Sequence, residues 1–447
     1  MAYSGSSAPQ RISVAPKGAD ASVISGPSVP INGNSASEVD YSAHPFLDPA
    51  LFRRDREALR YFRRLFRDSM RADGHYARLL NQLLHPIGED SDLGRDERTL
   101  ASFLQDESTY IRELLGMLPA EYAQPLEPTS EVSSCTDLRS LGELVFYKDR
   151  GDIEHERRVR FEAQRKLYLT KLLIQIEHTR MIQDGPRHRA YLIDLLEREL
   201  FGHVTDVRNE IASYAPDPEV DLMGGPAGAP PEETWGFRVH RVERQVSGSR
   251  REIEVWHFDT RFKRESAGYE YSPGRGEYRV SERVRFGEMQ RGHSASILSK
   301  MLRKGINNPN RISDMLGAKF IVKGERDVSR LAHLLHELLG GIFLFRNQVD
   351  LFRRPGDRGL MNRFSAPDFR AFKEDVDVLY RPIGTDHGRP YLFSVELQIL
   401  TVESFLQSVH SRAYTSHREY KRRQFLQGVM PLVFPAAIYT PARSFEV

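Results

Sequence analysis

Residues 312–322 read ISDMLGAKFIV, and this stretch decides how the second half of the chain is interpreted. Asp314 precedes Gly317, and Gly317 opens a run of β-forming residues that contains one charged side chain, Lys319. A short apolar run that follows a turn residue predicts a buried strand. Asp314 is then either an ordinary carboxylate at the end of a helix or an acid held at the start of the strand to bind a metal ion and a phosphate.

Strand and helix patterns alternate on both sides of this stretch. Strands are expected at residues 236–245, 251–262, 276–286, 317–322, 375–380 and 392–399, because apolar and polar residues alternate there. Helices are expected at 294–305, at 326–341 and from 402 to 424. This mixture predicts a β-sheet covered by helices.

The first half of the chain has helical periodicity instead. Apolar residues recur at helical spacing in residues 52–70, 74–86, 95–118, 154–184 and 188–214. Pro and Gly crowd residues 215–234, which predicts a linker. Residues 1–45 hold few large apolar groups, too few to offset the entropy of ordering them. The sequence therefore predicts an α+β protein with a disordered tail (1–45), an all-α helical domain (46–214), a linker (215–234) and a mixed-sheet domain (235–447).

Composition narrows the environment and the partners of the chain. Its 447 residues are too many for one ordinary core. The formal net charge of +2 argues against a general nucleic-acid coat, and no DNA partner is expected. With the single cysteine, Cys135, neither an intramolecular disulfide nor a multi-cysteine zinc site can form. The sequence contains no apolar run long enough for a membrane span and no signal-peptide core, so we expect a cytoplasmic protein without a membrane partner.

The expected strand at 392–399 carries a carboxylate between apolar neighbours. Its alternation places Ser394, Glu396 and Gln398 on one face. A carboxylate in mid-strand should not be buried without a partner. The simpler interpretation is an exposed face of the sheet, on which Glu396 contacts water.

The expected helix at 294–305 carries a basic group. Lys300, Arg303 and Lys304 stand at positions i, i+3 and i+4, so they share one side of the helix. This side is either a solvated charged face or a clamp for a polyphosphate, in which an arginine chelates two oxygens. Spacing alone favours the solvated face.

The order of these motifs resembles the synthetase domain of the RelA/SpoT family. The motifs are SILSKMLRKG (296–305), ISDMLGAKFIV (312–322), DFRAFKEDVDVLY (368–380) and VELQI (395–399). The resemblance covers roughly residues 280–425, about a third of the chain. It implies a nucleotidyltransferase-like fold and the transfer of pyrophosphate from ATP to the 3′-hydroxyl of GDP or GTP, which makes the (p)ppGpp of the stringent response. Some relatives instead modify the 3′ end of tRNA.

Position by position, the resemblance implies a metal site and a nucleotide site. Asp314 would hold Mg²⁺, and Glu396 would be the second carboxylate, which either aids metal binding or activates the acceptor hydroxyl. Phe369 would be the aromatic platform for the acceptor base. The residues implied to bind nucleotide are Lys300, Arg303, Lys304, Lys319, Phe369, Arg370, Lys373 and Gln398.

Several positions depart from the family pattern. Lys319 and Lys373 stand where the family has Arg and His, and Asp368-Phe369 replaces a Gly-Tyr pair. Leu400 replaces the arginine that usually follows the second acidic strand. Asp375 and Asp377 share one face of their strand and could join the acidic site, but an edge or solvent face is the simpler interpretation for them.

Three functional hypotheses follow. The first is a Mg²⁺-dependent pyrophosphokinase-like enzyme that uses ATP and a guanosine nucleotide or RNA acceptor. The second is a degenerate domain that binds a nucleotide or a partner without catalysis, because several motif residues differ. The third is a toxin-like synthetase that its N-terminal helical domain regulates. Those helices are also the expected surface for a homo-oligomer or a regulatory partner.

Overall fold

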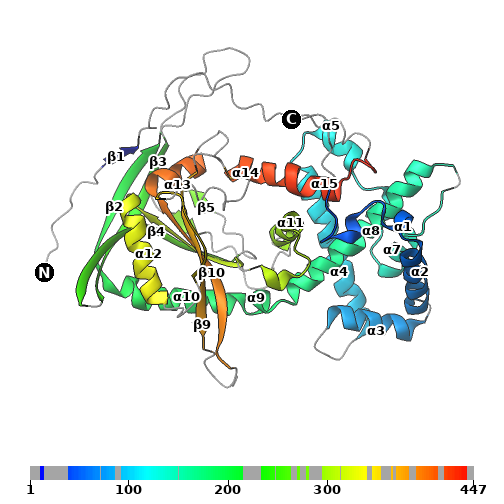
Figure 1. Cartoon of the computed structure of the whole chain (residues 1–447), viewed down its shortest axis with the longest axis horizontal. Coiled ribbons are helices and arrows are strands. Elements are labelled where there is room, and N and C mark those ends of the chain that lie inside the picture. Colours follow the sequence, from blue (N-terminus) through cyan, green and yellow to red (C-terminus); the bar gives the residue numbers. More distant parts are fainter. Residues whose placement is uncertain are drawn as a thin grey trace, which may run out of the picture. The chain divides into compact units, whose positions relative to one another are not determined.

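The protein is represented by a computed structural model, and many of its elements are labelled in Figure 1. The residues that it describes are 11–14, 39–70, 72–85, 92–149, 151–214, 233–246, 248–262, 269–271, 278–280, 294–312, 314–339, 345–353, 364–365, 369–381, 389–410 and 417–439. The chain forms two compact units. The sheet unit comprises Met1–Ser25, Arg180–Met289 and Ile312–Lys421, and the helical unit comprises Gly26–Thr179, Gln290–Arg311 and Arg422–Val447. The predicted α+β class is confirmed.

An eight-stranded mixed sheet forms the core of the sheet unit, in the order β1-β2-β3-β4-β7-β10-β9-β8. Its strands are β1 (Arg11–Val14), β2 (Val204–Tyr214), β3 (Glu233–Val246), β4 (Ser249–Phe262), β7 (Leu316–Val322), β8 (Phe345–Asp350), β9 (Phe372–Tyr380) and β10 (Tyr391–Thr401). The pairs β1–β2 and β7–β10 are parallel, and the other neighbours are antiparallel. Strands β5 (Tyr269–Tyr271) and β6 (Tyr278–Val280) form a separate two-stranded sheet.

Helices cover both faces of this sheet. Helix α10 (Gly185–Glu199) follows the short α9 (Arg180–Gln183) and, with α12 (Glu325–Leu339), packs on one face. The ring of His188 in α10 stacks on Phe393 of β10 with centroids 4.4 Å apart. Helix α13 (Val402–His410) places Leu406 in a buried cluster with Ile321 and Trp256, on the opposite face. The polar residues of the central strands lie on the face that carries α13.

The helical unit is built around α8 (Ile153–Glu177), which is buried along most of its length. Asp152 caps this helix by accepting hydrogen bonds from the backbone amides of Glu154 and His155, both 2.9 Å. Helices α4, α7 and α11 pack against α8. The other elements are α1 (Leu51–Arg54), α2 (Arg56–Met70), α3 (Asp73–Leu84), α4 (Leu93–Leu115), α5 (Ala120–Ala123), α6 (Ser130–Ser133), α7 (Leu138–Leu144), α11 (Ser294–Lys304), α15 (Met430–Val433), the 3-10 helices η1 (Pro45–Leu47), η2 (Gln124–Leu126) and η5 (Pro309–Arg311), and the π-helix η7 (Phe425–Val429). Helix α14 (His417–Gln424) spans the boundary between the segments of the two units.

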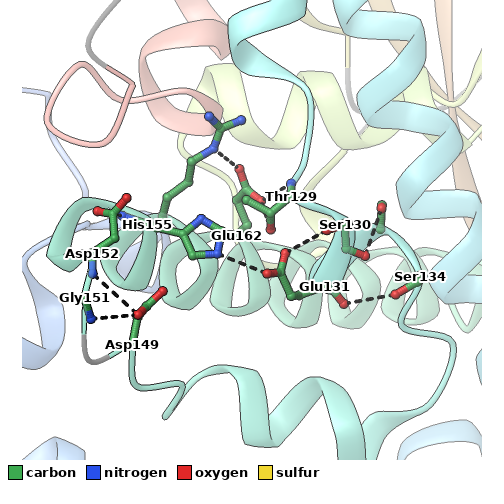
Figure 2. A network of polar contacts seen from close by, with 11 residues as sticks. Thr129, Ser130, Glu131, Ser134, Asp149, Gly151, Asp152, His155 and Glu162 are labelled. Carbon is green, nitrogen blue, oxygen red and sulfur yellow. Dashed lines mark hydrogen bonds and ion pairs between the residues drawn. The ribbon is translucent and has the colours of Figure 1, made fainter.

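A buried network of polar side chains lies in the core of the helical unit. Glu162 of α8 is fully buried, and its carboxylate accepts hydrogen bonds from the backbone and hydroxyl of Thr129 at 2.7 and 2.8 Å (Figure 2). Arg158 and Tyr439 donate to the same carboxylate at 2.9 and 3.0 Å. The buried Arg165 donates in turn to the hydroxyl of Tyr439. Each charge in this network has a partner, which is the condition for burying charges without a large loss of stability.

The helix predicted at 188–214 is wrong over its second part. The helix ends at Glu199, and Val204–Tyr214 is strand β2, which pairs with β3 along its length. Val204, Val207 and Ile211 recur at helical spacing, and this pattern wrongly indicated a helix. Pairing with β3 and burial of Ala212 and Tyr214 against the sheet determine the structure instead.

The expected tail and linker are only partly described. Within residues 1–45, Arg11–Val14 form β1 beside β2, and His44 is buried and donates a hydrogen bond to the carbonyl oxygen of Met301. The rest of the tail before residue 39 and residues 215–232 of the linker lie outside the described residues. Among the described helices, none combines the length and apolar character that a membrane crossing requires.

Candidate functional site

Polar side chains gather on one face of the four central strands of the sheet unit. Directly paired residues of neighbouring strands point to the same face, so the strand register shows which side chains meet. Lys319 of β7 pairs with Gln398 of β10, which pairs with Lys373 of β9. Two residues back along β10, Glu396 pairs with Asp375. We call this set the polar face: Asp259, Arg261, Lys319, Lys373, Asp375, Asp377, Ser394, Glu396 and Gln398.

Lys319 lies at the centre of the polar face. Burial lowers the pKa of its ammonium group to about 8, and the nearby charges of Arg261 and Lys373 add to that effect. Asp259 and Glu396 act in the opposite direction. Lys319 is thus within electrostatic reach of both acids and both cations. A phosphate that bound here would meet an amine whose charge is easily lost as the pH rises.

Glu396 and Asp375 are carboxylates at directly opposite positions of adjacent strands. Like charges in such a pair destabilise a sheet unless a cation compensates them. Asp375 accepts a 2.8 Å hydrogen bond from the side-chain amide of Asn347. Asn347 lies at an irregularity of β8 and has a φ of 57°, a left-handed conformation that asparagine tolerates better than most residues. The bulge of β8 therefore aims an amide donor at the acidic pair.

Asp377 is held in a similar way. Arg346 of β8 lies 2.5 Å from the carboxylate of Asp377 and also donates to Ser394, at 2.9 Å. Asp375 and Asp377 are 9% and 6% exposed, so the expectation of an edge or solvent face for them is wrong. The next strand, β8, buries them, because β9 is not the edge of the sheet.

Asp314 lies at the start of β7. It stands two residues before Leu316, which pairs with Val395, and three residues before Gly317, which pairs with Glu396. It follows the 3-10 helix η5, and its side chain is 9% exposed. Asp314 thus stands just before the start of a strand, and its binding of a metal ion and a phosphate stays a prediction.

The donors on and beside this face suit a magnesium ion. Mg²⁺ prefers oxygen ligands, and it is commonly held by one or two carboxylates together with waters and substrate phosphates. Asp314 and Glu396 supply such carboxylates. Within the described part of the chain, no group of three or more His, Cys, Asp or Glu residues is arranged to hold a metal ion. The two-carboxylate magnesium site therefore stays a prediction.

The predicted site residues at the start of β9 and just before it separate into two groups. The ammonium group of Lys373 lies over the ring of Phe369, 5.6 Å from its centroid, so these two predicted site residues are brought together. Arg370 instead forms an ion pair with Glu325 in the first turn of α12, at 3.3 Å, and both side chains are about half exposed. The ammonium group of Lys373 thus lies over one side of the Phe369 ring, whereas Arg370 pairs with helix α12.

The predicted phosphate clamp lies on α11, which belongs to the helical unit. Ser299 on this helix is hydrogen-bonded to Tyr110 of α4 at 2.9 Å. Lys300 and Arg303 are half-buried and Lys304 is exposed. Asp314 and Glu396 belong to the sheet unit, so a joint action of these three cations with the polar face stays a prediction.

Four polar residues of this region were not predicted from the sequence: Asp259, Arg261, Arg346 and Asn347. Asp259 and Arg261 alternate with buried Thr260 and Phe262, so their common face was visible in the pattern of the strand. Their place beside Lys319 follows only from the pairing of β4 with β7. The six residues of β8, FRNQVD, have no clear strand signal, and nothing local marked the bulge.

Comparison with known proteins adds little to this geometry. No family model matches the chain, and no match was found among curated proteins. Solved structures similar to parts of it include small alarmone synthetase 1 from Bacillus subtilis bound to its product pppGpp, with 18% identity over 34% of this chain and 69% of that chain, at a TM-score of 0.22. Small alarmone synthetase 2 from the same organism has 16% identity over 42% of this chain and 73% of that chain, at a TM-score of 0.23. Likeness at this level carries no argument about activity.

Proposed function

We propose that this protein is a magnesium-dependent pyrophosphokinase that transfers pyrophosphate from ATP to the 3′-hydroxyl of a guanosine nucleotide or an RNA end. The observation that carries the proposal is the polar face, on which Glu396 and Lys319 lie on paired strands, and Asp314 stands just before the strand that carries Lys319. The pairing of β7 with β10 and of β10 with β9 supports the proposal beside the order of the motifs in the sequence, which resembles the RelA/SpoT synthetase domain.

The proposed reaction forms one bond and breaks one. The 3′-oxygen of the acceptor attacks the β-phosphorus of ATP, the bond between that phosphorus and the α–β bridging oxygen breaks, and AMP leaves. Bound Mg²⁺, held by Asp314 and Glu396, would neutralise charge on the transferred group. Glu396 takes the proton of the attacking hydroxyl. Lys319 and Arg261 bind phosphate oxygens, and most of the rate gain comes from positioning.

The test is a transfer assay with the full chain, γ-labelled ATP, Mg²⁺ and a panel of GDP, GTP, AMP, ADP and tRNA. The proposal predicts that one acceptor gains label while AMP, rather than ADP, accumulates in equal amount. Glu396→Gln should lower the rate by about 100-fold or more, because general-base catalysis typically contributes that much. Arg238→Ala, an exposed arginine on β3, should leave the rate unchanged.

Two outcomes would reject the proposal: no acceptor gains label, or Glu396→Gln keeps full activity. The same assay with Lys300→Ala tests whether the basic helix α11 contributes. A normal Michaelis constant for ATP in that variant would remove Lys300 from the proposed site.

A second candidate function is nucleotide binding without catalysis. One observation favours it: Lys373 already lies over the ring of Phe369, the side chain expected to stack on the acceptor base. Calorimetry separates the two functions. Binding of ATP or GDP with no turnover supports the second candidate, whereas turnover of any acceptor rejects it.

A further inference from the structure

A second concentration of positive charge lies on the outer side of α12. This helix buries Leu331, Leu334 and Leu335 against the sheet unit. His336 of the same helix bonds to Glu374, which alternates with Lys373 and Asp375 along β9 and so points away from the polar face. Helix α12 therefore covers the face of the sheet opposite to the polar face.

Four residues on the outer side of α12 stand at i, i+3, i+4 and i+7: Arg326, Ser329, Arg330 and His333. With Arg251 from the start of β4 and Arg353 from the turn after β8, they line an open pocket of about 500 Å³. Three separate segments thus bring arginines to one place. A solvated helix face would need no such convergence.

The charges around this pocket are incompletely compensated. Arg251 pairs with Glu337 at 3.2 Å, and Arg330 pairs with Asp327 at 3.6 Å. Arg326 and Arg353 form no ion pair with any residue that the structure describes. The backbone amide of Arg353 donates to the carboxylate of Asp350 at 3.2 Å, which fixes the turn that carries this arginine.

We propose that this pocket binds a small polyphosphate anion, such as triphosphate, pyrophosphate or the phosphate tail of a nucleotide. A guanidinium presents planar paired donors that match two phosphate oxygens, and two such groups here have no carboxylate partner within the described residues. The hydroxyl of Ser329 adds a neutral donor. An open pocket of this size accommodates a small anion, whereas a long nucleic acid needs an extended basic surface that a chain of net charge +2 does not readily supply.

Isothermal titration calorimetry with sodium tripolyphosphate tests the proposal on the full chain. The double variant Arg326→Ala/Arg353→Ala should weaken binding by about 100-fold, roughly 10-fold for each arginine that no longer donates to a phosphate oxygen. Arg326→Lys keeps the charge but loses the planar fork, so it should give a smaller loss. Arg238→Ala is the matched control and should bind as the unchanged protein does. Thermal unfolding of each variant shows whether the fold is kept.

The polar face is the competing location for the anion, and Lys319→Ala distinguishes the two. If Lys319→Ala abolishes tripolyphosphate binding while the double arginine variant retains it, the anion binds on the polar face and the proposal is overturned. Absence of binding to the unchanged protein also overturns it, as does binding of a single-stranded RNA oligomer that tripolyphosphate does not displace. Failure of the transfer assay would leave this pocket unaffected, because it lies on the other face of the sheet.

Discussion

The two units differ in how far their charged side chains are buried and how they are paired. In the helical unit, Glu162 and Arg165 are fully buried; Glu162 accepts hydrogen bonds from its neighbours, and Arg165 donates to the hydroxyl of Tyr439. On the polar face of the sheet unit, Glu396 and Lys319 stay half-buried, and Glu396 is set opposite another carboxylate. A closed network stabilises a fold, whereas an open face with like charges side by side lowers stability and is typical of a binding or catalytic site.

The variant with the largest expected effect on this comparison is Glu162→Ala. It removes the acceptor of four hydrogen bonds and one of the carboxylates that compensate Arg165, so we expect a loss of about 3–5 kcal/mol in the free energy of unfolding. Urea denaturation followed by circular dichroism measures it. Glu131→Ala is the control, because Glu131 pairs with His155 at a site where both side chains are 32% exposed, and it should cost at most about 1 kcal/mol. Equal losses in the two variants would contradict the closed network.

His188 tests whether the sheet unit also contains a buried titratable group whose hydrogen bonding resembles that of the helical unit. Its ring is buried, is hydrogen-bonded to the hydroxyl of Tyr391 at 2.7 Å, and has a pKa that burial lowers to about 4. Between pH 6.5 and 4 the unfolded chain binds a proton that the folded chain does not, so stability should fall as the pH falls through this window, by roughly 3 kcal/mol in total. Unfolding of the unchanged protein and of His188→Gln across this range measures the difference. An identical pH slope in both would show that His188 does not cause it.

Lys319 should make the polar face sensitive to alkaline pH. Because its pKa is lowered to about 8, its positive charge is present below that pH and is lost above it. We expect the affinity for ATP to fall by about 10-fold between pH 7 and pH 10, the amount expected when one hydrogen bond loses the assistance of a charge. In Lys319→Arg the fall should disappear, because arginine stays charged throughout this range. A fall that persists in that variant would assign the pH dependence to another group.

The smallest expected effect concerns Asn347. Asn347→Gly keeps the left-handed backbone and removes the amide that bonds to Asp375, whereas Asn347→Ala also forces that backbone on a residue with a Cβ. The alanine variant should therefore be less stable than the glycine variant by about 1 kcal/mol. Chemical denaturation of the pair measures this. Equal stability would mean that the bulge of β8 relaxes.

The sequence predicted two central strands and two helices well because their patterns are strong and local. β7, β10, α11 and α12 lie within a residue or two of their expected positions. β2 and β8 were not predicted, because their strand character depends on pairing with distant partners rather than on alternation. The same limit applies to the site. Glu396 and Lys319 were identified, but their neighbours Asp259 and Arg261 depend on a register that no local pattern specifies.

Each unit is assembled from three separate segments of the chain, and this affects how the protein can be divided into fragments. Strand β2 lies before the expected linker and pairs with β3 after it. A fragment that begins at residue 235 would lose this partner and expose the hydrogen-bonding edge of β3, an arrangement that promotes aggregation. The same fragment would carry Gln290–Arg311 and Arg422–Val447 without the remainder of their unit. Genetic or proteolytic separation at the linker therefore gives two incomplete pieces, and the roles of the two units are better separated by point substitutions in the full-length chain.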